Sequence, residues 1–204
     1  MSEVTVTGKA LDVRELPTVV FGHRSLMWWG TLGMMAIEGT VFALAIMAYF
    51  YLRSHQETWP LHTLPPDLLW GTLNLVVMLV SFVPAHLAKK AGEGLRLRGC
   101  QIWLVVSCVF GVAFCAIRIM EFATLNTRWD SSAYGSVVWL LLGLHTTHIV
   151  TDLVDTIVLT VLFFTGPLDG KRFGDVSENS FYWYFVVATW IPIYLVIYWG
   201  ARAL

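Results

Sequence analysis

Four titratable side chains lie close together within one long apolar stretch of the chain. Residues 143–155 read GLHTTHIVTDLVD and contain His145, His148, Asp152 and Asp155. These positions step by three, four and three residues, which places the four side chains on one face of a helix. Histidine and carboxylate side chains in such an arrangement could hold a metal ion or exchange protons with neighbouring groups.

Two interpretations of these four residues stay open. In the first, His145 and His148 are metal ligands and Asp152 is a third. In the second, the residues form hydrogen bonds between helices, which explains polar side chains in a membrane helix equally well. Either way, a row of charges facing lipid is implausible, so we expect this face to point into a helical bundle or toward a partner subunit.

Three further charged residues lie inside apolar segments, where a charge costs about 2.5–3.5 kcal/mol on insertion scales. Glu38 is about as far from the start of its apolar segment as Asp152 and Asp155 are from the end of their segment. We therefore expect these three carboxyl groups to lie at similar depths in the membrane. Glu38 could relay protons or act as a structural hydrogen-bond donor. Arg118 and Glu121 are three positions apart, which predicts a structural ion pair within one helix.

The composition predicts an integral membrane protein that carries these residues on helices. Of the 204 residues, 57% are hydrophobic and 13% are charged, about half the charged fraction of a soluble domain. Crossing a bilayer takes roughly 20 mainly apolar residues. Five segments qualify, at about 26–52, 67–88, 100–123, 135–165 and 181–203. We therefore predict an all-α membrane bundle of five transmembrane helices, with residues 1–25 as a cytoplasmic segment and 26–204 as one membrane domain.

Basic residues predict how this bundle is oriented, because an excess of Lys and Arg marks the cytoplasmic side. One side is expected to carry Lys9, Arg14, Arg24, Lys89, Lys90, Arg96, Arg98, Lys171 and Arg172, and the other only Arg53, Arg128 and Arg202. We therefore expect the N-terminus inside and the C-terminus outside. Lys171 and Arg172, in the fourth connection, are candidate contacts for lipid headgroups. The net charge of −1 gives no electrostatic basis for binding nucleic acid.

Four stretches of the sequence match, in order, the pattern of one family of membrane proteins. LGMMAIEGTVFALAIMAYFYL carries Glu38 where that family has a buried carboxylate, and IRIMEF carries Glu121 and the following phenylalanine at its acidic-aromatic pair. LLGLHTTHIV carries His145 and His148 at the two histidine positions of a third motif, and FYWYFVVATWIPIYLVIYWG is similar to the closing helix. Over residues 26–203 the chain resembles subunit III of the haem-copper terminal oxidases, in its short five-helix bacterial form.

The resemblance implies a non-redox accessory subunit of a respiratory cytochrome c or quinol oxidase in the bacterial inner (plasma) membrane. Such a subunit stabilises the catalytic subunit and supports proton uptake during oxygen reduction. Haem and copper would lie in subunit I, its partner, with no metal or other cofactor on this chain. Membrane lipids would be further partners, with bound phospholipid. Glu38, His145, His148, Asp152 and Asp155 would then be buried polar, proton-related residues.

Four positions depart from the family pattern. Tyr184 and Val187 stand where the family has histidine and aspartate, and Asp152 and Asp155 stand where it has glycine and an uncharged residue. An accessory protein of nitric oxide reductase, from the same superfamily, is therefore an alternative. A second alternative is a membrane-embedded metal-binding enzyme or ion carrier, centred on Glu38, His145, His148 and Asp152.

Overall fold

Five long helices make up the computed structural model, which describes residues 19–61, 63–167 and 169–203. They are α1 (Leu26–Ser54), α2 (Leu68–Glu93), α3 (Leu97–Ala123), α4 (Ala133–Thr165) and α5 (Gly170–Tyr194). α5 continues through a π-helical turn, Leu195–Trp199, into the short α6, Gly200–Ala203. All five long helices are apolar enough to cross a membrane, and the described part of the chain contains no strand. The predicted all-α class with five candidate spans is confirmed.

Local sequence sets several helix boundaries. Ser25 precedes α1 and its side chain accepts a hydrogen bond from the Met27 N–H, while Ser132 caps α4 in the same way. Such caps satisfy N–H groups that have no partner within the helix. α5 begins at Gly170, well before the apolar segment predicted from residue 181. Lys171 and Arg172, predicted in a connection, therefore lie in the first turn of α5.

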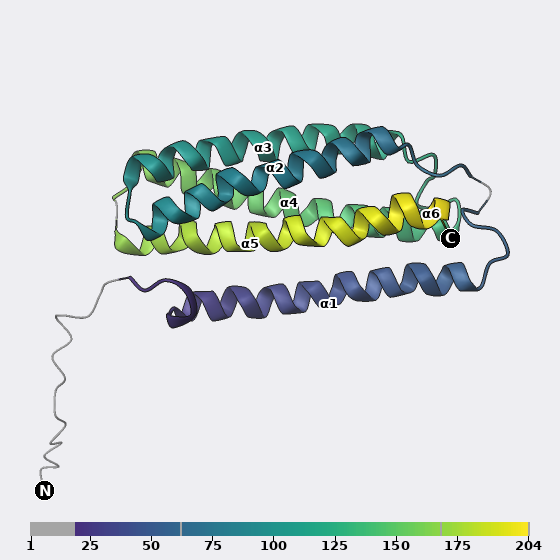
Figure 1. Ribbon diagram of the computed structural model, residues 1–204, viewed down its shortest axis with the longest axis horizontal. Coiled ribbons are helices and arrows are strands. Elements are labelled where there is room, and N and C mark those ends of the chain that lie inside the picture. The colour runs from purple at the N-terminus through teal and green to yellow at the C-terminus, as the bar shows by residue number, and fades with distance from the viewer. Residues whose placement is uncertain (1–18, 62, 168, 204) are drawn as a thin grey trace, which may run out of the picture.

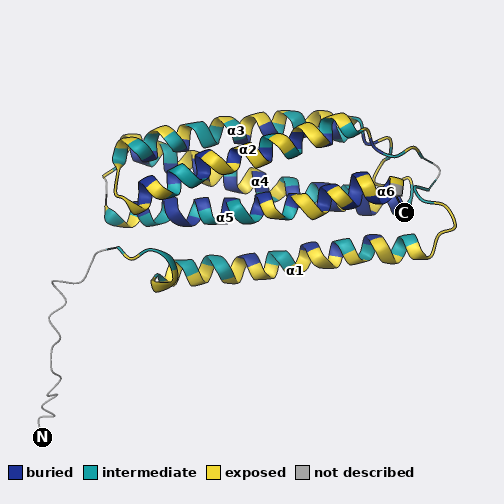
Figure 2. Ribbon diagram, in the orientation of Figure 1, coloured by how far each residue is buried: buried dark blue, intermediate teal, exposed yellow. Residues whose placement is uncertain are grey.

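The helices run alternately up and down the bundle in the order of the sequence (Figure 1). α2 packs against α3 and α5, α4 packs against α3 and α5, and α1 contacts α4 and α5 along one side. Figure 2 shows that α5 is the most buried helix and that α1 is largely exposed. α1 buries only Met35, Phe42, Ala45 and Tyr49, which form one narrow stripe along the helix.

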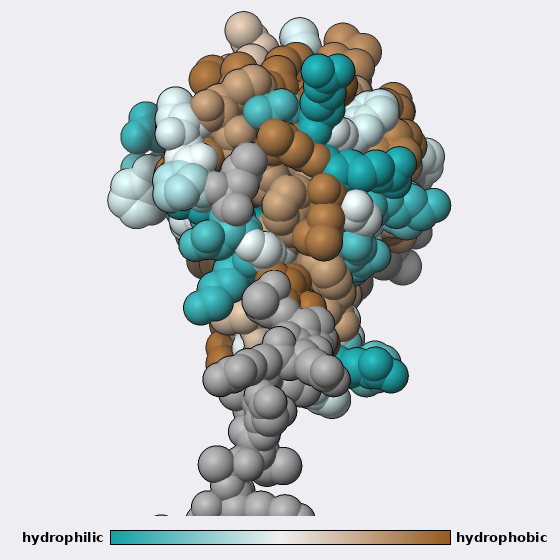
Figure 3. Space-filling model, turned by 90° about the vertical axis from the view of Figure 1, so that its left-hand side faces the viewer, coloured by the Kyte–Doolittle hydropathy of each residue, from teal (hydrophilic) through white to brown (hydrophobic). Residues whose placement is uncertain are grey.

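One end of the bundle collects the basic residues. α1 and α5 begin there, and α2 connects to α3 there, so Arg24, Lys89, Arg96 and Lys171 lie at the same end. Figure 3 looks at this end and shows hydrophilic side chains around hydrophobic ones. Residues 1–18, which include part of the predicted N-terminal segment and two of its basic residues, lie outside the described residues.

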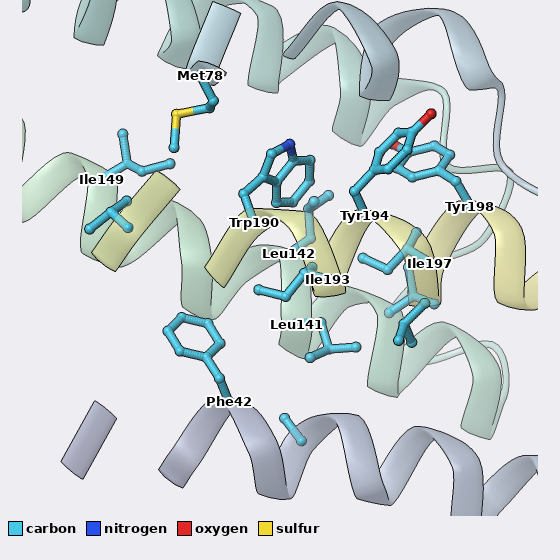
Figure 4. Close-up of a cluster of buried hydrophobic side chains, with 14 of the residues drawn as sticks. Phe42, Met78, Leu141, Leu142, Ile149, Trp190, Ile193, Tyr194, Ile197 and Tyr198 are labelled. Carbon is cyan, nitrogen blue, oxygen red and sulfur yellow. The ribbon is translucent and has the colours of Figure 1, made fainter. Parts of the chain in front are cut away.

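Large apolar side chains fill the centre of the bundle (Figure 4). Trp190 of α5 is fully buried, Phe42 reaches the core from α1, and Met78 reaches it from α2. Lipid is as apolar as this core, so the hydrophobic effect does not by itself hold membrane helices together. Close packing and hydrogen bonds between helices hold them together. The buried polar residues of this chain therefore contribute to holding its helices together.

Candidate functional site

The four titratable residues of α4 divide between separate polar networks. His145 is fully buried and contacts α3, His148 contacts α1, and Asp152 and Asp155 both contact α5. Asp152 is buried, as expected for a face that points into the bundle, but Asp155 is exposed on the side of a cavity. The helical spacing thus places them on one face, while three different neighbouring helices determine what each side chain touches.

Glu121 is the centre of the first network. Its Oε2 atom lies 2.9 Å from Nη1 of Arg118 and accepts a hydrogen bond from Asn74 at 2.5 Å. Its Oε1 atom accepts a hydrogen bond from the hydroxyl of Tyr198 at 2.5 Å. Both side chains of the ion pair are 2% exposed or less, so the attraction is only weakly screened by solvent. We call these residues with His145 the Glu121 cluster; it joins α2, α3, α4 and the π-helical turn that follows α5.

Arg118 has a second set of contacts that suits a buried cation. Its guanidinium carbon lies 4.0 Å from the ring centre of Trp190 and 4.6 Å from that of Phe114. Nη2 of Arg118 is 3.2 Å from Nδ1 of His145, and Nε2 of His145 donates to the Val186 carbonyl at 3.0 Å. The histidine therefore carries its proton on Nε2 and accepts on Nδ1. Aromatic faces and a neutral imidazole replace water around the cation.

Glu38 is the centre of the second network, which joins α1 to the bundle. The hydroxyl of Tyr182 donates to Oε2 of Glu38 at 2.8 Å, and Nε2 of His148 lies 3.6 Å from Oε1. Nδ1 of His148 contacts the Leu144 carbonyl at 2.6 Å, so it carries the proton on that side. Glu38 thus lies between a phenol on α5 and an imidazole on α4.

Asn179 links the two aspartates. Its Nδ2 atom lies 3.3 Å from Oδ1 of Asp152 and 3.3 Å from Oδ2 of Asp155, and its Oδ1 accepts from the hydroxyl of Thr156 at 3.2 Å. One amide group therefore donates to two carboxyl groups one helical turn apart. Neither aspartate has a basic residue as a partner in the ion pairs of the described residues.

A cavity of about 550 Å³ opens between α1, α4 and α5 at the end where α1 begins. Glu38, Asp152 and Asp155 all line it, so the three acids that the sequence placed at similar depth share one space. We call it the acidic cavity. It is lined by Met27, Thr31, Met34, Glu38, Thr151, Asp152, Asp155, Val158, Leu159, Leu162, Asp175, Glu178, Asn179 and Tyr182.

Four polar residues of α5 in this cavity did not emerge from the sequence. Asp175, Glu178, Asn179 and Tyr182 are spaced at i, i+3, i+4 and i+7, which is one face of a helix. That spacing could have identified them. The first three lie in a segment that hydrophobicity alone assigns to a polar connection, because residues 170–180 contain few large apolar side chains, whereas Tyr182 lies in the predicted span.

The histidines do not converge on a common point. His145 is engaged with Arg118 and Val186, and His148 with Leu144 and Glu38. Within the described ranges, no three His, Cys, Asp or Glu side chains are grouped closely enough to hold a metal ion. The interhelical hydrogen-bond interpretation is supported by His145, which contacts Arg118 of α3 and Val186 of α5, and by the contacts of both aspartates with Asn179 of α5.

Lys171 and Arg172 occupy different settings at the start of α5. Lys171 is exposed, whereas Nη1 of Arg172 reaches the Leu162 carbonyl in the last turn of α4 at 3.5 Å. A cation near the carbonyl end of a helix is favourable, because that end carries a partial negative charge. Arg172 thus has a contact within the protein in addition to any that it makes with lipid.

Comparison with known proteins gives one consistent result. The family described as cytochrome c oxidase subunit III matches residues 34–202. The probable cytochrome c oxidase subunit 3 of Mycobacterium tuberculosis is 28% identical over 173 residues, which cover 83% of this chain and 85% of that protein. Cytochrome c oxidase subunit 3 of Alkalihalophilus pseudofirmus is 26% identical over 205 residues, with 97% of each chain covered.

Proposed function

The chain belongs to the cytochrome c oxidase subunit III family, and from this membership we propose how it works within a terminal oxidase. It is an accessory component of that complex, a multi-pass membrane protein. We propose that it packs on the catalytic subunit I and stabilises the haem and copper centres there. In this proposal it holds no redox centre of its own, it resides in a bacterial plasma membrane, and it supports proton uptake from the cytoplasmic side.

The observation that carries the proton role is the setting of Glu38. A carboxyl group that contacts both a tyrosine hydroxyl and an imidazole can exchange a proton with either partner. Glu38 also lines the acidic cavity, whose lining residues lie in the part of α1, α4 and α5 nearest the basic end of the bundle. That end is the cytoplasmic one if positive charge marks the inside. Protons could therefore reach Glu38 from the cytoplasm through the cavity.

Lipid contacts are the second part of the proposal. Lys171 is exposed at the basic end, where an anionic headgroup of the inner leaflet would lie if the N-terminus is cytoplasmic. Lys89 is held over the rings of Phe181 and Tyr184, 5.0 and 5.7 Å from their centres, so its position is set by the protein. We propose that bound phospholipid seals this end of the subunit against its partners.

The test is Glu38→Gln in the assembled oxidase, with turnover, proton pumping and active lifetime measured. Glutamine keeps the size of the side chain and cannot release a proton, so we expect slower turnover or faster inactivation. Glu93→Gln is a matched control, because Glu93 lies at the same end of the bundle and outside the acidic cavity. Unchanged turnover, pumping and lifetime in Glu38→Gln would reduce Glu38 to a structural residue.

An accessory protein of nitric oxide reductase remains a second candidate, supported by Tyr184 and Val187. The family's histidine and aspartate are absent there; Tyr184 instead contacts Nδ1 of His86 through its hydroxyl at 3.0 Å. Substrate consumption by the co-purified complex separates the two candidates, because an oxidase consumes oxygen and a nitric oxide reductase does not require it.

A further inference from the structure

We propose that the protein binds a water molecule inside the bundle, in a small chamber next to the acidic cavity. The chamber is lined by residues of α2, α3, α4 and α5, and its volume is about 20 Å³. A cavity needs roughly 10–15 Å³ to hold one water molecule, counted as the space open to the centre of that molecule. This space, which we call the inner chamber, therefore has room for one water molecule and is too small for an organic ligand.

Polar side chains distinguish the inner chamber from apolar cavities, which stay dry. Six of its twelve lining residues carry a hydroxyl, amide or carboxyl group, and they come from all four helices. The six are Ser81, Ser107, Asp152, Thr156, Asn179 and Ser180. A buried water molecule makes about three hydrogen bonds, so the wall offers more polar partners than one water molecule requires.

Two of these side chains keep acceptor positions that a water molecule can use. The Ser81 hydroxyl donates to the Met78 carbonyl and accepts from the indole N–H of Trp183, which leaves it one lone pair. Asp152 accepts a hydrogen bond from Asn179, and a carboxyl group can accept several. The two hydrogen atoms of one water molecule therefore have acceptors available on α2 and on α4.

Asp152 and Asn179 separate the inner chamber from the acidic cavity, because both residues line both spaces. The hydrogen bond between them measures 3.3 Å, beyond the usual N–H···O distance of about 2.9–3.0 Å. A weak contact in the dividing wall is easily broken. Water therefore enters the inner chamber from the acidic cavity when this contact opens.

Hydrogen exchange at two indole groups of α5 tests the proposal. The indole N–H of Trp183 is bonded to Ser81, and both residues line the inner chamber. The indole N–H of Trp190 is buried without a hydrogen-bond partner, and Trp190 lines neither space. Exchange needs contact with water and is slowed by a hydrogen bond, so a dry interior would make Trp183 the slower of the two. A bound water molecule reverses this order, and we expect Trp183 to exchange faster.

The exchange is followed by NMR of the indole N–H groups after the full chain, in dodecyl maltoside micelles, is transferred to heavy water. Trp183→Phe and Trp190→Phe identify the two signals. The comparison is made within one molecule, so both groups experience the same micelle, temperature and global stability.

Two variants change the wall of the inner chamber. Thr156→Val removes a polar group with little change of shape, and should slow the exchange of Trp183 by about fivefold, the effect of losing one hydrogen bond to the water molecule. Ala88→Val adds two methyl groups that occupy the space and should slow it as well. Thr160→Val is the matched control, because Thr160 lies one turn further along α4 and outside the chamber. It should leave the exchange of Trp183 unchanged.

A loosened bundle would speed the exchange of Trp183, so slower exchange separates loss of water from loss of structure. Exchange of Trp183 no faster than that of Trp190 in the unaltered chain would overturn the proposal. Unchanged or faster exchange of Trp183 in Thr156→Val would overturn it too, and Ala88→Val decides the point if Thr156→Val does not fold. None of these measurements uses oxidase activity, so the proposed function is tested separately.

Discussion

At the scale of single residues, the glutamates at the centres of the two polar networks have different chemical settings. Glu121 is 1% exposed and has a partner on each oxygen, with Arg118 as a permanent cation beside it. Glu38 is paired with groups that can give or take a proton, and its side chain is 22% exposed toward the acidic cavity. The first arrangement suits a fixed charge that holds helices together, and the proposed proton role of Glu38 rests on the second.

The contact between Tyr182 and Glu38 gives a first prediction. Tyr182→Phe removes the donor to Glu38 Oε2 and should lower the free energy of unfolding by about 0.5–1.5 kcal/mol, the usual net contribution of a hydrogen bond. Combined with Glu38→Ala, the two losses should be less than additive, because each single change already removes the shared contact. Titration with sodium dodecyl sulfate measures these values; strict additivity would contradict the contact.

The ion pair of the Glu121 cluster gives a second prediction. Glu121→Ala leaves Arg118 buried without its counter-charge and should cost about 3–5 kcal/mol, enough to reduce the yield of folded protein sharply. Asp130→Ala is the control, since it breaks an exposed pair with Arg128 whose side chains are 77% and 44% exposed, and should cost under about 1 kcal/mol. Comparable losses in the two variants would show that burial does not strengthen the Glu121 pair.

The sequence identifies residues of this kind when a charge stands out in an apolar segment. Glu38, Arg118 and Asp152 were found in that way. Their partners were harder to find, because His145 and His148 look equivalent in the sequence and only the neighbouring helices give one to Arg118 and the other to Glu38. Polar partners such as Asn179 lie in a segment that is itself polar, where one more polar residue does not stand out.

At the scale of helices, α5 and the π-helical turn after it position most of these contacts. Pro192 lies inside α5 and has no N–H to donate, which interrupts the regular hydrogen bonds of the helix just before Leu195–Trp199. Tyr198, in the π-helical turn, reaches Glu121 and packs closely on Gly71 of α2. The hydrophobic pattern predicts a helix here, but it cannot predict a local change of helical period or the side of α5 that meets α2.

The close approach at Gly71 gives a third prediction. A Cβ atom at Gly71 would overlap the ring of Tyr198, so Gly71→Ala should destabilise the bundle by about 1–3 kcal/mol and disturb the hydrogen bond to Glu121. Gly33→Ala is the matched control, since Gly33 lies in α1 with open space around its Cα. There the gain in helix propensity should leave stability equal or slightly higher. Titration with sodium dodecyl sulfate measures the stability of both variants. Equal changes in the free energy of unfolding for Gly71→Ala and Gly33→Ala would contradict the predicted overlap.

At the scale of the whole molecule, the number of helices and their order followed from hydrophobicity because a bilayer demands long apolar segments. The extent of α5 did not follow, since its first residues are polar and are held in a helix by packing against α2 and α4. The sequence also could not predict that α1 is the least buried helix, because all five segments are similarly apolar. α1 is the helix with the most surface left for lipid or a partner subunit.

The most direct test of the central claim is the metal and haem content of the chain and of what purifies with it. The full chain is isolated from its native membrane in mild detergent, and iron, copper and zinc are measured before and after its separation from co-purifying subunits. Membership in an oxidase predicts that haem and copper co-purify and remain with a partner chain, leaving this chain free of metal. Stoichiometric metal that stays on this chain and is lost in His148→Ala, with no haem-bearing partner, would contradict it.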